Sequence, residues 1–595
     1  MESFPSPGTL LFSTATPNPN GAAESELYLF KGNAAAAPVS TIEKEPGVAF
    51  PPPPGFSEKQ IFTLLIVHFN DLHGRLIRFT PDGDQLIFSR LAWQLSSSRE
   101  QCRDLPDRAV LALSAGDDCG GAVFDELLVT SNGEKAAHPY YRLYSRLGVD
   151  AACIGNHDFD HGVDFLSAAI RREARFPLLA ANLKAPPGIQ DTIPPAALLV
   201  VKGIRVGLIG LITRAETRLP PDRGTIVDPR PVAGALVKVL RPLCDVLVII
   251  SHLGYCMETS RVPMADSGDV LLARSLPPGS VDLIVGGHSH STLNQDSLQS
   301  QNVINGIPIV QAGSDGEFVG LVELQLSKYQ VSLRSARLIP TKSLAVNEDF
   351  ETREVQPLKK WAHDLLSKKV GIVEADEDLS TETVRAGFAS GELALANYFT
   401  DALAARTAAQ GQPVDFAMID ASSIQQGFLE TAKLSYGDCF EMMPYADTVR
   451  IYELTGVQLL ELLSENALRL NLPEEEREER GFLQFSSHVR YTIKSGRVRG
   501  QSKVLEATIN GIPLEEQLDR VFKIATTCFV RTLSMVWESS LEGTLRAQLL
   551  QLQEFPFRET DLPLRREITT YIREHGGITA AGGAVRDGRL RIVYP

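Results

Sequence analysis

The 595-residue chain is poor in several features that mark particular classes of protein. Its seven cysteines form no CxxC pair and no regular pattern, which argues against a zinc ribbon or a disulfide framework and favours free thiols. No stretch reaches the roughly 18 apolar residues of a membrane-spanning helix. The first 14 residues lack a basic segment followed by a long apolar core, so no secretory signal is visible. We therefore expect a soluble, cytoplasmic protein with no membrane partner.

A surplus of positive charge is also missing. Lys and Arg number 58 against 73 Asp and Glu, which gives a net charge of −15. Binding to a nucleic-acid polymer depends on clustered cations, so we expect no such partner. A small anionic substrate is still compatible with this charge, because bound divalent cations reverse the local field.

The length exceeds what one hydrophobic core supports, and the composition changes along the chain. Residues 1–58 are rich in Pro, Ala, Ser and Gly and end in Pro51–Pro54, which is typical of a tail with a stiff spacer. We predict an α/β domain over 59–345, a linker helix over 346–370 and a second mixed α/β domain over 371–595.

Buried strands of the first domain are predicted from short apolar runs: Ile61–Phe69, Ala109–Leu113, Val206–Ile212, Val246–Ile250 and Val281–Val285. Amphipathic helices are predicted between them, at Ser89–Ser97, Tyr140–Leu147 and Val163–Ala174. Such alternation predicts an α/β fold, in which functional side chains gather at the carboxyl ends of the strands.

Five polar clusters follow apolar runs, and each contains a ligand suited to a hard metal ion. They are Asp71-Leu72-His73-Gly74, Gly116-Asp117, Gly155-Asn156-His157-Asp158, Ser251-His252 and Gly287-His288-Ser289-His290. Carboxylate, amide and imidazole ligands without cysteine suit Mn, Zn, Fe, Mg or Co. The set predicts a site for two divalent metal ions and therefore an enzyme.

The spacing within the clusters suggests how the ligands are divided between two metal ions. Asp71 and His73 are two residues apart, so in an extended segment both side chains point to the same side. The carboxylate of Asp117 has two oxygens and could bridge two ions. Two such ions clamp an in-line displacement at phosphorus and generate hydroxide near neutral pH. His157 would then stabilise charge at the leaving group, and Asp160 could orient it.

These residues resemble the calcineurin-like metallophosphoesterases of the 5'-nucleotidase and 2',3'-cyclic-nucleotide phosphodiesterase branch. The strings His68-Phe69-Asn70-Asp71-Leu72-His73-Gly74 and Gly155-Asn156-His157-Asp158-Phe159-Asp160 resemble two motifs of that branch. The resemblance implies a four-layer αββα domain and a His157–Asp160 catalytic pair. It assigns one metal to Asp71, His73, Asp117 and His290, and the other to Asp117, Asn156, His252 and His288.

The C-terminal half resembles the branch's 5'-nucleotidase-like, substrate-binding domain through Leu434–Asp438, Pro444–Val449 and Gly481–Ser486. Tyr445 stands where the family stacks an aromatic ring on the base. Gln425 stands where the family has an arginine that grips the substrate, and Gln carries no charge.

The resemblance implies 5'-nucleotidase-like hydrolysis of a small phosphate ester, a nucleotide, in nucleotide catabolism, with a metal-bridging hydroxide attacking phosphorus in line. The missing arginine leaves one alternative open within the enzyme class: a phosphodiesterase or phosphatase acting on cyclic nucleotides or non-nucleotide phosphate esters. The non-enzyme alternative is a metal-dependent binding module without turnover.

Overall fold

The computed structural model forms two compact units, Met1–Lys360 and Trp361–Pro595. The boundary between them falls inside the predicted linker segment, within helix α8 (Gln356–Leu366). The structure describes residues 5–57, 60–78, 83–128, 138–214, 217, 219, 223–255, 268–328, 330–387, 391–428, 433–444, 447–470, 482–497, 501–527 and 556–595.

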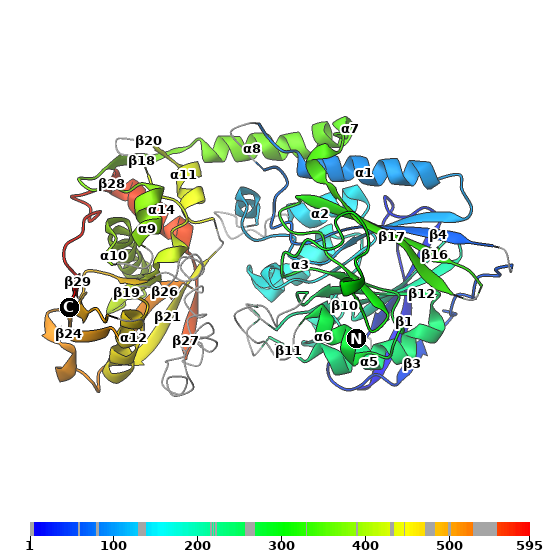
Figure 1. Ribbon diagram of the computed structural model, residues 1–595, viewed down its shortest axis with the longest axis horizontal. Helices are drawn as coiled ribbons and strands as arrows, with labels where there is room; N and C mark the ends of the chain where they lie inside the picture. The colour runs from blue at the N-terminus through cyan, green and yellow to red at the C-terminus, as the bar shows by residue number, and fades with distance from the viewer. Residues whose placement is uncertain are drawn as a thin grey trace. The chain divides into compact units, whose positions relative to one another are not determined.

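Two sheets form the centre of the first unit (Figure 1). The nine-stranded sheet has the order β14 (Val303–Ile304), β15 (Ile307–Val310), β13 (Leu283–Gly286), β12 (Val246–His252), β10 (Ile204–Ile212), β9 (Ala196–Val201), β2 (Ser25–Lys31), β1 (Thr9–Ala15) and β3 (Thr41–Lys44). The six-stranded sheet has the order β17 (Val331–Pro340), β16 (Phe318–Leu326), β4 (Phe62–Phe69), β5 (Arg108–Ser114), β6 (Ala151–Cys153) and β7 (Leu178–Leu179). A short ribbon pairs β8 (Leu183–Lys184) with β11 (Thr225–Ile226).

Apolar side chains from both sheets meet in one core, which includes Ile66, Leu111, Val206 and Val248. Helices cover the outer faces: α1 (Ile87–Cys102), α2 (Pro139–Leu147) and α3 (Val163–Glu173) lie on the side of the six-stranded sheet, and α5 (Pro229–Leu240) and α6 (Asp269–Ser275) on the side of the nine-stranded one (Figure 1). This is the predicted αββα layer order. The five predicted strands and three predicted helices are all present, with ends shifted by a few residues.

Parallel pairing explains why the ligand clusters can meet. In one sheet β4, β5 and β6 run parallel, and in the other β10, β12 and β13 do. The carboxyl ends of parallel strands lie at a common edge, so the loops after β4, β5, β6, β12 and β13 are brought together there.

The prediction that residues 1–58 form a tail is wrong for most of that segment. Strands β1, β2 and β3 extend the nine-stranded sheet, and β2 pairs with β9 in antiparallel register. Phe12 and Phe30 are fully buried, with ring centroids 5.1 Å apart. The composition misled because prolines and glycines occupy the turns between short strands, whose partner β9 lies far along the chain.

The described residues of the second unit form three sheets. Their orders are β22 (Leu483–Phe485), β19 (Phe416–Asp420), β26 (Val521–Thr527), β21 (Thr448–Thr455) and β27 (Phe557–Pro563); β25 (Ile512–Pro513), β24 (Lys503–Ile509), β23 (Val489–Lys494) and β29 (Leu590–Val593); and β20 (Lys433–Ser435), β18 (Lys369–Glu374) and β28 (Gly577–Thr579). Its longer helices are α10 (Ala394–Ala409), α12 (Gly456–Leu468) and α14 (Leu564–Glu574), with shorter α9 (Thr381–Ala386) and α11 (Tyr436–Met442).

Capping boxes begin two helices of the second unit, one of them within the Leu434–Asp438 motif. Ser435 with Asp438 and Thr455 with Gln458 form reciprocal capping boxes at the starts of α11 and α12. The acidic run 474–480 lies outside the described residues.

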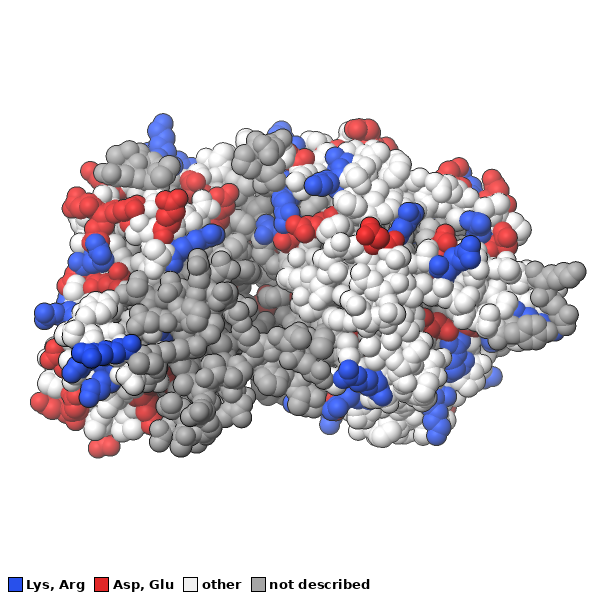
Figure 2. All heavy atoms as spheres, viewed as in Figure 1, with Lys and Arg blue, Asp and Glu red and all other residues white. Residues whose placement is uncertain are grey.

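In the described part of the chain, surface charges of both signs are mixed and the cysteines form no disulfides. Acidic and basic side chains are mixed over the face drawn in Figure 2. The five described cysteines are free thiols: Cys102, Cys119, Cys153, Cys244 and Cys439. None of the helices that the structure describes has both the length and the apolarity to cross a membrane.

Candidate metal centre

The predicted ligands of the first unit converge at the common strand edge. There are three groups of side chains in the described residues whose ligand atoms lie within 4.8 Å of one another inside each group. The groups are Asp71, His73 and His290; His73, Asp117 and His157; and Asp117, His252 and His288. His73 and Asp117 each belong to two groups, so the three groups adjoin one another.

The backbone at these positions is unusual. Asp71, His73, Asp117, His288 and His290 all have positive φ, between 44° and 77°. The expectation of an extended segment at Asp71–His73 is therefore wrong, since both residues are left-handed. Non-glycine residues adopt this conformation rarely, and such strain concentrates at functional sites.

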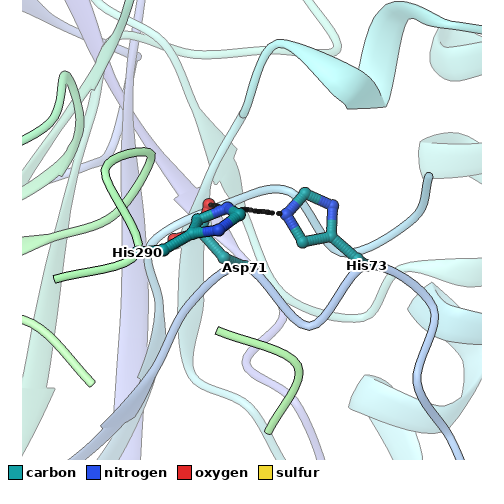
Figure 3. Close-up of side chains that lie close together, drawn as sticks. All are labelled: Asp71, His73 and His290. Carbon is teal, nitrogen blue, oxygen red and sulfur yellow. Dashed lines mark hydrogen bonds and ion pairs between the residues drawn. The ribbon is translucent and has the colours of Figure 1, made fainter. Parts of the chain in front are cut away.

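Asp71, His73 and His290 form the first group, drawn in Figure 3. The two imidazoles face each other with their Nε2 atoms 3.0 Å apart. Asp71 Oδ1 lies 3.5 Å from His290 Nε2 and 3.9 Å from His73 Nε2. Three ligand atoms are thus directed at one small volume.

Asp117, His252 and His288 form the second group, and Asn156 lies beside it. His252 Nε2 is 3.0 Å from Asp117 Oδ2 and 3.2 Å from the amide oxygen of Asn156. The Nδ1 of His252 lies 2.6 Å from the carbonyl oxygen of Ala115, to which it donates. This hydrogen bond fixes the ring so that Nε2 faces the centre, as metal-binding histidines require.

His157 lies at the edge of the centre. Its Nδ1 is 2.9 Å from Asp160 Oδ2, and its backbone N–H donates to Asp117 Oδ1 at 2.9 Å. Its ring centroid lies 5.4 Å from that of His73. The structure therefore brings the predicted pair together next to Asp117, with Asp160 buried and His157 partly exposed.

The electrostatics of the centre favour positive charge. Burial alone would raise the pKa of Asp117, but the neighbouring His252 and His157 imidazoles hold it well below the usual range. Burial likewise lowers the pKa of His252, yet Asp117 reverses this and raises it to about 10. Divalent cations suit such a cluster of buried carboxylates and imidazole nitrogens, and would compete with protons for it. The donor set therefore fits metal ions.

Several supporting residues were missed by sequence reasoning. Asn70 donates to Asp71 Oδ2 and to the carbonyl of Gly313, both at 2.6 Å, and its own oxygen accepts from Ala312 N–H. The buried Gln311 accepts from Ser291 N–H at 2.6 Å and from Ser289 Oγ at 2.9 Å. Asn70 adjoins a ligand in the motif and could have been noticed, whereas Gln311 gave no local signal.

Neither predicted substrate residue lies in the first unit. Gln425 follows β19 in the second unit, and its amide donates to the carbonyl of Ser422 at 2.6 Å. Tyr445 lies outside the described residues.

Known protein families match parts of both units. Residues 64–292 match the calcineurin-like phosphoesterase family, and residues 370–533 match the C-terminal domain of 5'-nucleotidases. A 5'-nucleotidase of Vibrio cholerae is 26% identical over 455 residues, covering 70% of this chain and 78% of the relative. Protein UshA of Yersinia enterocolitica is 26% identical over 466 residues, covering 72% and 80%.

Solved structures show the same fold. A 5'-nucleotidase precursor from Thermus thermophilus has a TM-score of 0.56 at 24% identity, covering 89% of this chain and 99% of that one. A Staphylococcus aureus protein in complex with alpha-ketoglutarate has a TM-score of 0.66 at 18% identity, covering 90% and 100%.

The fold and the converging ligands define a metallophosphoesterase, a class of hydrolases that uses divalent metal ions. Residues 64–292 belong to the calcineurin-like phosphoesterases, and residues 370–533 to the C-terminal domain of 5'-nucleotidases.

Proposed function

We propose that this enzyme hydrolyses nucleoside 5'-monophosphates with two divalent cations bound in the first unit. The observation that carries the proposal is the convergence of ligands from the ends of five strands, with His73 and Asp117 each shared between two groups. The relatives named 5'-nucleotidases and the matching C-terminal domain support the choice of substrate.

One cation would be held by Asp71, His73, Asp117 and His290, and the other by Asp117, Asn156, His252 and His288. Mn, Zn, Fe, Mg and Co all accept such oxygen and imidazole ligands. When bound, the two cations supply the nucleophile at neutral pH and neutralise charge on the phosphoryl oxygens.

Asp160 would orient His157, and His157 would protonate the leaving group. Asp160 would accept from the Nδ1–H of His157, so that the protonated ring carries its second proton at Nε2 and can give it to the departing ester oxygen. The backbone N–H of His157 donates to Asp117, so the proton donor and the shared ligand hold each other in place. The second unit would bind the nucleoside through Tyr445, with Gln425 contributing a polar contact in place of the family's arginine.

The decisive experiment compares wild type and Asp117→Ala on p-nitrophenyl phosphate and on adenosine 5'-monophosphate, with metal content measured on each sample. We expect the variant to lose its metal and essentially all hydrolysis. Activity within a few-fold of wild type would refute the mechanism.

A panel of cyclic nucleotides, sugar phosphates and nucleoside monophosphates then tests the substrate. Tyr445→Ala should impair nucleotides more than p-nitrophenyl phosphate. Equal impairment of every substrate would contradict base stacking at that residue.

A further inference from the structure

Helix α2 lies against the metal centre and presents three fully buried tyrosines, Tyr140, Tyr141 and Tyr144. Positions 140 and 144 are one turn apart and 141 and 144 are three residues apart, so the three rings occupy neighbouring parts of one helical surface. Three buried phenol groups on one nine-residue helix require hydrogen-bond partners, because an unsatisfied buried hydroxyl is costly.

Each tyrosine donates to a different buried carboxylate. Tyr144 donates to Asp118 at 2.5 Å and Tyr140 to Asp125 at 2.6 Å. Tyr141 donates to Asp158 at 3.3 Å. None of these carboxylates is among the proposed metal ligands.

Two of the carboxylates adjoin residues of the centre directly. Asp118 follows the shared ligand Asp117, and its backbone carbonyl accepts from Gly74 N–H at 2.9 Å, which connects it to the loop of His73. Asp158 follows His157, and its Oδ2 accepts from Gly155 N–H at 2.8 Å, which holds the turn around Asn156.

The third carboxylate acts on the loop that packs against His157. Asp125 accepts from the backbone N–H groups of Gly121 at 2.7 Å and Ala122 at 3.0 Å. That loop passes close to His157: a Cβ built on Gly120 would lie 3.0 Å from Cβ and 3.2 Å from Cγ of His157. Tyr140 therefore reaches His157 through Asp125 and the backbone of Gly120.

We propose that α2 is a positioning element of the active site, whose tyrosine hydroxyls set the ligand loops through Asp118, Asp125 and Asp158. The roles are divided: Tyr144 positions the shared ligand Asp117, and Tyr140 positions His157. The inference rests on the proposed two-metal hydrolysis. It adds three tyrosines that are not among the proposed ligands and that lie in none of the motifs quoted above.

The experiment uses the full chain with single hydroxyl deletions. Tyr144→Phe and Tyr140→Phe remove one oxygen each, and Tyr398→Phe is the matched control. Tyr398 is also fully buried and donates to Gly577 O at 2.8 Å, but it lies in α10 of the second unit. Calorimetry measures Mn²⁺ binding, and steady-state kinetics with p-nitrophenyl phosphate give kcat and KM. Thermal melting checks that each variant folds.

We expect Tyr144→Phe to weaken Mn²⁺ binding about tenfold or more, the usual effect of removing a partner that orients metal ligands. Tyr140→Phe should lower kcat about tenfold at saturating Mn²⁺, with KM and Mn²⁺ affinity changed less than threefold. Tyr398→Phe should match wild type within twofold in Mn²⁺ affinity, kcat and KM, even if its melting temperature falls as far as that of the α2 variants.

Tyr144→Phe with wild-type Mn²⁺ affinity, or Tyr398→Phe with an equal loss, would overturn the inference. If Tyr144→Phe does not fold, Asp118→Asn and Asp118→Ala replace it. The amide keeps an acceptor for Tyr144 and should retain Mn²⁺ binding, whereas equal losses in both would overturn the role of this hydrogen bond. A wild type that neither binds Mn²⁺ nor cleaves the ester would instead refute the proposed function itself.

Discussion

At the scale of single residues, the centre combines ligand chemistry with backbone strain. Asp71, His73, Asp117, His288 and His290 each hold a left-handed conformation, which costs of order 1 kcal/mol or more per residue. The surrounding hydrogen bonds stabilise it: Asp71 N–H donates to Gly116 O, and His73 N–H to Asp117 O, both at 3.0 Å. The neighbouring loops therefore fix one another.

Two adjacent glycines provide a residue-scale prediction. Gly120 and Gly121 both have positive φ, but an added Cβ would press on His157 only at Gly120, while nothing lies within 4 Å at Gly121. Gly120→Ala should therefore lower kcat for p-nitrophenyl phosphate at least tenfold more than Gly121→Ala, which carries only the backbone strain. Steady-state kinetics at saturating Mn²⁺ measure this, and equal kcat values would contradict the contact.

A second residue-scale prediction separates proton donation from metal binding. His157→Asn removes the proposed proton donor, so kcat should fall about 10²- to 10⁴-fold. Metal content should stay close to wild type, because His157 is not among the assigned ligands. Elemental analysis and kinetics on one sample decide this; loss of metal in parallel with activity would make His157 a ligand instead.

At the scale of elements, α2 begins with a histidine cap. His138 Nδ1 accepts from Tyr141 N–H at 3.3 Å, and its ring stacks on that of Tyr141 at 3.7 Å between centroids. Burial lowers the pKa of His138 to about 3, with the nearby His161 adding to the effect. The folded state therefore holds the neutral imidazole, which alone can accept at Nδ1.

The sign of the resulting pH dependence follows from this lowered pKa. The stabilisation is complete above the ordinary histidine value near 6.5 and is lost as pH falls from there toward about 3, because the unfolded chain takes up the proton first. His138→Asn keeps a capping acceptor that does not titrate. Its free energy of unfolding should fall less than that of wild type between pH 6.5 and 4.5. Urea denaturation at each pH measures this, and an identical pH dependence in both proteins would contradict the lowered pKa of His138.

The sequence was most informative about the helices and strands. Runs such as Val246–Ile250 are apolar throughout because β12 is buried on both faces, and that pattern is local. The polar clusters after the runs predicted the convergence of the ligands for the same reason. The positive φ at Asp71 and His73 could not be predicted, since it depends on bonds to Gly116 and Asp117 from another loop. The tyrosines of α2 read as ordinary core residues, because their carboxylate partners lie up to 26 positions away.

At the scale of the whole molecule, the N-terminal strands connect the two layers of the first unit. The loop after β1 leaves the nine-stranded sheet, and Asn18 donates to Val149 O at 3.0 Å beyond the end of α2. The buried Asp150 accepts from Ala22 N–H at 2.7 Å and from Arg99 at 3.0 Å. This segment is thus part of the catalytic unit, although the phosphoesterase family match begins only at residue 64.

A stability measurement tests this integration. Phe12→Ala removes a fully buried ring and should lower the free energy of unfolding of the first unit by about 3–5 kcal/mol. Tyr594→Ala, which truncates an aromatic side chain that is 68% exposed, should change stability by no more than about 0.5 kcal/mol. Urea denaturation compares the two, and a Phe12→Ala loss as small as that of Tyr594→Ala would mean that the N-terminal strands are not integral.

The pairing of β2 with β9 also fixes an order of events during synthesis. Residues 32–195 separate the two strands. At roughly 5–20 residues per second the ribosome needs some 10 to 30 s to deliver β9 after β2. Until β9 follows, the hairpin of β1 and β2 lacks the strand that pairs with β2. Strands β1 and β2 are therefore made well before the strand that joins them to the rest of the nine-stranded sheet.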